Sequence, residues 1–455
     1  MELEMKWLDQ INEEIKNNGP TIAYEKEQWE KPSIYKVPSQ VTELNKNAFK
    51  PQAISFGPYH YGEENLKLME KHKHRALLHF LKRCGKPVEL LFQRLNQVAK
   101  ELKDSYKSLD PIWTNNTPKF IEMMILDGCF ILEILKVNYE SEILVDYDKN
   151  DHVFGEHGKL HLTPYIKRDM LILENQIPMT VLHILTKFET NVEEEDHRES
   201  LKEKIIKFLD PWPSRIIKNT SLFKTKIIRL GKCTHLLDLY RKSMIQENAS
   251  HTTPSLRPPM RNLLNCEEPD EDYIIRSARE LQEAGVRFKK SDSRSLKDVS
   301  FNRGVLRLPA VKLDDSTKYI FLNLIAFERL HVGAGNEVTS FICFMDTIID
   351  TAQDVPFLSR SGILINALGN DKLVAKLFNS LAKEISMDRN GELDMVMTNM
   401  KYYCEKPWKS WRASLIQTYF RNPWAMVSLV AAFFLFALTI IQTIYTVGQF
   451  YQKDC

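Results

Sequence analysis

Paired cysteines and an excess of charge of either sign are missing from this sequence. Its seven cysteines are scattered and include no CxxC pair, so neither a disulfide framework nor a zinc site is indicated. Lysine and arginine number 62 against 60 aspartates and glutamates, which leaves a formal net charge of +2. Proteins that hold nucleic acid carry a strongly basic surface, and we therefore predict no nucleic-acid partner.

The motifs of common catalytic and cofactor sites are also missing. The chain contains no GxSxG, GxGxxG or GxxxxGK[ST] sequence. His157 and His161 have a spacing at which two imidazoles can share a metal ion, but Gly158 weakens the helix and no glutamate follows the first histidine. We therefore expect no metal and no cofactor, and we favour a protein without enzymatic activity.

Long hydrophobic runs are absent except at the C-terminal end. Residues 1–18 are acidic and amphipathic, unlike a signal peptide. By contrast, Ala425–Val447 is apolar on every face, with no charged residue between Arg421 and Lys453. At 1.5 Å per residue this segment spans about 34 Å, enough to cross a hydrocarbon core of about 30 Å. We predict one transmembrane helix here, with the lipid bilayer as its partner.

Basic residues flank this segment unequally. Lys406, Lys409, Arg412 and Arg421 precede it, whereas Lys453 alone follows it. The positive-inside rule then places the large domain in the cytosol, without distinguishing the plasma membrane from the endoplasmic reticulum. An exported domain is the alternative, because three N-x-S/T triplets could accept glycans. Their asparagines are Asn115, Asn219 and Asn248.

Helical patterns dominate the rest of the chain. Apolar residues recur every three or four positions in the stretches 64–83, 117–137, 168–189 and 336–388. Short β-branched and aromatic runs predict a small β element near 285–325. These runs are Gly285–Lys289, Val299–Phe301, Gly304–Leu308 and Tyr319–Leu324. The predicted fold class is mainly α, with this small β element and one C-terminal transmembrane helix.

The predicted organisation has five parts along the chain. They are a helical extension (1–32), a mostly helical domain (33–404) with an internal linker at 247–272, a juxtamembrane amphipathic segment (405–424), the transmembrane helix (425–447) and a short tail (448–455).

Two carboxylates lie inside apolar runs and are the candidates for catalysis. Asp127 in MMILDGCFILEIL and Glu174 in DMLILENQIPMTVL lose water on burial and need compensating partners. A buried pair could do acid–base work. The structural alternative is that each caps backbone N–H groups or pairs with an arginine such as Arg168.

Two further polar runs are expected at the surface. Glu70 with Lys73 or His74 has the spacing of an ordinary surface pair on a helix. The run Gly57–Gly62, GPYHYG, is a rigid turn with one histidine and two tyrosines, a composition suited to recognition as well as to turn formation.

Several blocks together resemble a known plant family. They are SIYKVPSQVTELNKNAFKPQAISFGPYHYG (33–62), MMILDGCFILEIL (123–135), DMLILENQIPMTVL (169–182), SARELQEAGVRFK (277–289), LRLPAVKLDDSTKYIFLNLIAFER (306–329) and TSFICFMDTIIDTAQDV (339–355). The chain is similar over about residues 33–447 to the family known as domain of unknown function 247. Relatives often carry a second histidine where this chain has Tyr61.

The resemblance implies a land-plant protein with one C-terminal transmembrane helix and no established enzymatic activity. Some relatives have been linked to grass self-incompatibility and to stress or defence. We therefore expect a membrane-anchored interaction or recognition and signalling module with an unidentified protein partner. The alternatives are an enzyme that uses Asp127 and Glu174, and an exported recognition domain with a role of the self-incompatibility type.

Overall fold

The computed structural model describes most of the chain. The described residues are 12–13, 31–139, 147–190, 194–210, 220–246, 277–383, 385–387, 391–404 and 423–452. The predicted linker at 247–272 and most of the predicted extension (1–32) and juxtamembrane segment (405–424) lie outside these residues. Of the three glycosylation triplets, the one at Asn115 is described.

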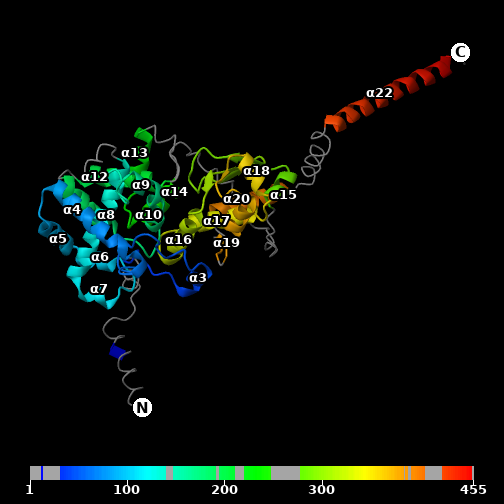
Figure 1. The fold of residues 1–455 in the computed structure, drawn as a ribbon. Coiled ribbons are helices and arrows are strands. Elements are labelled where there is room, and N and C mark those ends of the chain that lie inside the picture. Colours follow the sequence, from blue (N-terminus) through cyan, green and yellow to red (C-terminus); the bar gives the residue numbers. More distant parts are fainter. Residues whose placement is uncertain are drawn as a thin grey trace.

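The first part of the fold is a body of helices packed around α8 (Thr117–Tyr139), at the left of Figure 1. Fourteen of the 23 residues of α8 are buried, on every face, as expected for a central helix. At Gly128 a Cβ atom would lie 2.3 Å from Leu185 Cδ1, so this glycine lets α11 (Met179–Thr190) approach closely. The other helices of this part are α3 (Ser39–Leu44), η1 (Glu64–Leu66), α4 (Lys67–Cys84), α5 (Val88–Gln97), α6 (Ala99–Asp104), α7 (Pro111–Asn115), α9 (Glu156–His161), α10 (Thr163–Asp169), α11 (Met179–Thr190), α12 (Glu194–Leu209), α13 (Thr220–Arg229) and α14 (Leu236–Ile245).

The second part combines helices with two small sheets. Strand β3 pairs in parallel with β1 and antiparallel with β2, while β4 pairs in parallel with β5. The strands are β1 (Arg287–Lys290), β2 (Ser300–Asn302), β3 (Val305–Leu308), β4 (Val311–Leu313) and β5 (Leu364–Asn366). The helices are α15 (Ala278–Glu283), α16 (Thr317–Leu330), α17 (Glu337–Ile348), α18 (Val355–Arg360), α19 (Asp371–Leu381) and α20 (Glu392–Cys404).

Buried polar contacts join the two parts. Arg241 on α14 forms ion pairs with Glu328 at 2.7 Å and with Glu337, and Glu328 also accepts from the backbone N–H of Val338. The buried ring of His235 lies between Ser33 and Phe327, with Nε2 2.9 Å from the Ser33 carbonyl oxygen. One continuous apolar core also extends through both parts of the fold.

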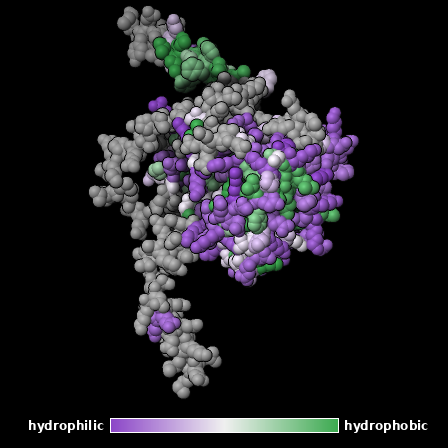
Figure 2. All heavy atoms as spheres, turned by 90° about the vertical axis from the view of Figure 1, so that its left-hand side faces the viewer, coloured by the Kyte–Doolittle hydropathy of each residue, from purple (hydrophilic) through white to green (hydrophobic). Residues whose placement is uncertain are grey.

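The last helix, α22 (Pro423–Gln452), lies apart from this body in Figure 1. Its window Val427–Thr446 has a mean hydropathy of 2.3, and none of it is buried against the rest of the chain. Figure 2 shows α22 as an apolar surface at the top, whereas the body face toward the viewer is mostly hydrophilic. Among the described residues, α22 is the one helix that is long and apolar enough to cross a membrane.

Mainly helical architecture with a few short strands is confirmed, but two local predictions were wrong. The stretch 168–189 is interrupted by the loop Met170–Pro178 between α10 and α11, where side chains such as Asn175 and Gln176 take over backbone hydrogen bonds and Pro178 disfavours a helical residue before it. The stretch 336–388 does contain helices, namely α17, α18 and α19, although β5 and the glycines Gly362 and Gly369, both at positive φ, divide it. The run Tyr319–Leu324 lies in α16 rather than in a strand.

Candidate functional site

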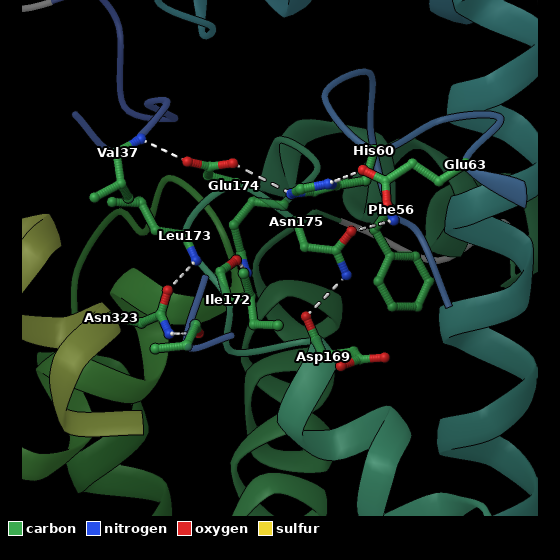
Figure 3. A network of polar contacts seen from close by, with 12 residues as sticks. Val37, Phe56, His60, Glu63, Asp169, Ile172, Leu173, Glu174, Asn175 and Asn323 are labelled. Atoms are coloured by element: carbon green, nitrogen blue, oxygen red, sulfur yellow. Dashed lines mark hydrogen bonds and ion pairs between the residues drawn. The ribbon is translucent and has the colours of Figure 1, made fainter. Parts of the chain in front are cut away.

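A buried loop between α10 and α11 is the centre of the polar network in Figure 3. This loop, Met170–Pro178, carries Glu174, Asn175 and Gln176, and the last two side chains are at most 1% exposed. Buried backbone outside a helix or strand needs hydrogen-bond partners from elsewhere. Side chains of the loop and of its neighbours supply them, which explains why polar residues occur inside so apolar a sequence.

Asn175 and Asp169 attach the segment Gln52–Phe56 to this loop. Asn175 Oδ1 accepts from the Phe56 N–H at 2.6 Å, and its Nδ2 donates to the Ile54 carbonyl at 3.0 Å. The buried Asp169 carboxylate accepts from three successive N–H groups at 2.6–3.0 Å. Their residues are Gln52, Ala53 and Ile54. Burial raises the pKa of Asp169, and the three N–H groups oppose that shift.

Asn323 links the same loop to the second part of the fold. Its Oδ1 accepts from the Leu173 N–H at 2.9 Å, and its Nδ2 donates to the carbonyl oxygens of Ala48 and Tyr319. Figure 3 shows this side chain reaching the loop from α16. Asn323 thus connects three segments that are distant in sequence.

Both carboxylate oxygens of Glu174 contact other segments of the chain. Its Oε1 accepts from the Val37 N–H at 2.7 Å, and its Oε2 lies 3.3 Å from His60 Nε2. His60 Nδ1 lies 2.6 Å from Glu63 Oε1 on its other side (Figure 3). The predicted partner Arg168 is therefore wrong for Glu174. The Arg168 guanidinium donates to the Asn47 carbonyl and stacks on Tyr319.

Asp127 binds the same turn through Gly57. Its Oδ2 accepts from the Gly57 N–H at 2.7 Å, and its Oδ1 lies 2.7 Å from Lys73 Nζ. Gly57 has φ +72°, and a Cβ atom there would lie 2.5 Å from the Gln176 carbonyl oxygen, so glycine is required. The two candidate carboxylates thus hold residues 57 and 60 of one turn.

Lys73 is not the surface residue that was expected. Its side chain is fully buried and pairs with Glu70 at 2.7 Å as well as with Asp127. Burial alone would lower the pKa of Lys73, but the charges of Asp127 and Glu70 raise it. Burial raises the pKa of Asp127 to about 6 against the opposing effect of Lys73, so both groups are charged at neutral pH.

His60 makes the stability of the fold depend on pH. Burial lowers its pKa, but the hydrogen bonds and charges of Glu174 and Glu63 outweigh burial and hold the pKa above 6.5. The protonated ring therefore stabilises the fold fully below pH 6.5, and this contribution is lost as pH rises through the folded-state pKa. We expect His60→Gln to cost about 1.5–3 kcal/mol near pH 6, because charge-assisted hydrogen bonds are lost.

The expected cost shrinks as the pH rises, and denaturant unfolding at a series of pH values measures it. His74→Gln on the exposed face of α4 is the control and should give a small, flat difference. A His60→Gln difference that is equally flat would contradict the proposed role of the charged ring.

Of the other sequence candidates, the paired histidines and Asn115 lie apart from this network, whereas Tyr61 lies on the turn that it holds. His157 and His161 are both on α9, with ring centroids 4.5 Å apart. Among the described residues, no group of three or more histidine, cysteine or acidic side chains could hold a metal ion. Asn115 is exposed at the end of α7. Tyr61 is 38% exposed and packs edge-on against the buried Trp113 at 5.0 Å.

Comparison with known proteins finds relatives that match most of the chain. The family model described as "Plant protein of unknown function" (DUF247) matches residues 34–438. UPF0481 protein At3g47200 of Arabidopsis thaliana is 29% identical over 93% of this chain and 88% of its own length. Putative UPF0481 protein At3g02645 of Arabidopsis thaliana is 23% identical over 90% of this chain and 89% of its own length. No solved structure matches the chain.

Proposed function

The chain belongs to this family of plant proteins of unknown function, and on that basis we propose that it is a single-pass membrane protein whose helical domain binds other proteins in the cytosol. The observation that carries the membrane part is the exposed apolar surface of α22. Twelve leucine, isoleucine, valine or phenylalanine residues in Ala425–Val447 favour insertion by on the order of 5 kcal/mol. The basic residues that precede α22 favour a cytosolic domain.

Two features of the domain support a role in binding rather than in catalysis. The carboxylates Asp127 and Glu174 are both engaged with backbone N–H groups and bases. The turn that they hold presents Tyr61, a half-exposed aromatic ring braced by Trp113. Rigid, partly exposed tyrosines are enriched in protein interfaces. We therefore expect this turn to form part of the partner surface.

Membrane insertion is tested on microsomes from plant cells that express the full-length chain. We expect the protein to stay in the membrane after carbonate extraction. The double substitution Phe434→Arg and Leu438→Arg should release it, because two arginines near the centre of the span cost about 5–7 kcal/mol and cancel the insertion energy. Added protease should digest the domain, and glycosidase should leave its mobility unchanged.

The same preparation tests the alternative topology. A protected domain whose glycosidase-sensitive mobility shift disappears in the Asn115→Gln variant would place the domain on the other side of the membrane and overturn the cytosolic proposal. Partner binding is tested by cross-linking in the same microsomes. A specific cross-linked product that is lost in Tyr61→Ala supports the binding role, and the lack of any specific product contradicts it.

A further inference from the structure

A cavity of about 180 Å³ lies where the two parts of the fold meet, away from the Met170–Pro178 loop. Its walls come from α12, α13 and α14 on one side and from β4 and α16 on the other. Small-molecule sites often occur at such junctions. The volume slightly exceeds that of an apolar protein cavity of about 150 Å³ that binds benzene. One ring-sized ligand would therefore fill it.

Most of the cavity wall is apolar, and it also carries several charged and polar side chains. Ile227, Leu230, Leu296 and Phe321 are among the apolar lining residues. The polar lining includes three cations against two carboxylates, an excess of one positive charge. These groups are Lys226, Arg294, Lys312, Asp210 and Asp314.

The carboxylates do not neutralise Lys226 directly. Asp210 lies 3.8 Å from Arg294 Nη1, and Asp314 accepts from the hydroxyl groups of Ser316 and Thr317 at the start of α16. No carboxylate among the described residues lies within ion-pair distance of Lys226. Burial, and after it the charge of Arg294, lowers the pKa of Lys226, and the more distant charge of Asp210 only partly opposes that shift.

A second unsatisfied group, the side-chain oxygen of Gln246, lies beside Lys226. Gln246 Nε2 donates to the Lys226 carbonyl oxygen at 2.6 Å, but its Oε1 is buried and receives no hydrogen bond from the described residues. A buried acceptor without a donor is costly, and a ligand with an O–H or N–H group would satisfy it. The cavity thus offers an apolar space, a cation that lacks an anion and an acceptor that lacks a donor.

We propose that this cavity binds a small apolar monocarboxylate, with its carboxylate at Lys226 and Arg294 and its hydrocarbon ring against Leu230, Leu296 and Phe321. A single carboxylate balances the excess positive charge of the wall. A doubly charged anion would exceed that excess by one charge. The proposal concerns a ligand of the domain and does not depend on its topology or on its protein partner.

The probes are phenylacetate and its uncharged isostere phenylacetamide, added to the full-length protein in lipid nanodiscs. Saturation-transfer NMR detects binding, with empty nanodiscs as the blank. We expect phenylacetate to bind at least about tenfold more tightly than phenylacetamide, because its carboxylate gains a charge-assisted hydrogen bond. In Lys226→Gln the preference should fall to less than about threefold, since that bond loses its charged donor.

Ala310→Leu provides a second variant, since it adds bulk to the wall without changing its charge. It should abolish the binding of both probes. No binding to the wild-type protein, equal binding of acid and amide, or binding that is unchanged in Ala310→Leu would each overturn the proposal.

Discussion

Replacing Lys73 with methionine is expected to lower the free energy of unfolding by about 3–5 kcal/mol. The substitution removes the ammonium group that lies 2.7 Å from Asp127 Oδ1 but keeps most of the apolar stem. Asp127 is 1% exposed, so without Lys73 its carboxylate must either stay charged with no base beside it or take up a proton, and either outcome costs stability. Breaking such a pair costs far more than the pair contributes to folding. Denaturant unfolding of the full-length chain in detergent, followed by far-UV circular dichroism, measures the loss.

The same helix offers a matched control. Lys67 pairs with Glu64 at the i,i+3 spacing that Lys73 has with Glu70, but the side chains of Lys67 and Glu64 are both more than half exposed. Lys67→Met should therefore cost at most about 1 kcal/mol. In the Lys73→Met, Asp127→Asn double variant the buried charge is gone while an oxygen remains for the Gly57 N–H, so part of the stability should return. Equal losses in Lys67→Met and Lys73→Met would refute the buried-pair argument.

The sequence was sufficient to locate the central helices and the two carboxylates. An acidic residue inside an apolar run signals burial, and Asp127 and Glu174 are both capped by backbone N–H groups. Their side-chain partners were not predictable. Lys73 stands among charged residues on α4 and therefore resembles a surface lysine. The periodicity of α4 alone cannot show which of its faces packs against α8. The same rule that identified Asp127 would have identified Asn323, which interrupts an apolar run in α16.

The secondary-structure errors have a common physical cause. Tyr319–Leu324 is rich in aromatic and β-branched residues, but as part of α16 it buries Phe321, Leu322 and Leu324 against the core, and packing outweighs local preference. The loop before Pro178 was missed because its buried polar side chains take the place of helical hydrogen bonds. This replacement of helical hydrogen bonds depends on contacts with the segment around Ile54, and the local sequence does not reveal those contacts.

Asp169→Ala is expected to destabilise the fold by about 3–6 kcal/mol. The carboxylate is fully buried, and its loss leaves the N–H groups of Gln52, Ala53 and Ile54 without an acceptor. Each orphaned buried donor costs about 1–3 kcal/mol, and part of that cost is recovered if the segment relaxes toward water. Hydrogen exchange of these three amides, together with denaturant unfolding, measures the effect.

One further variant separates the loss of acceptors from the loss of charge, and another is a control at the surface. Asp169→Asn keeps one acceptor oxygen and should lose about half as much stability, with partial protection of the same amides. Asp110→Ala removes the N-cap of α7, where the carboxylate accepts from the Ile112 N–H at the surface, and should cost about 0.5–2 kcal/mol. Unchanged exchange at residues 52–54 in Asp169→Ala would show that Asp169 does not hold this segment. Because Asn175 and Asp127 bind the residues that follow, a true loss there should also loosen the turn that presents Tyr61.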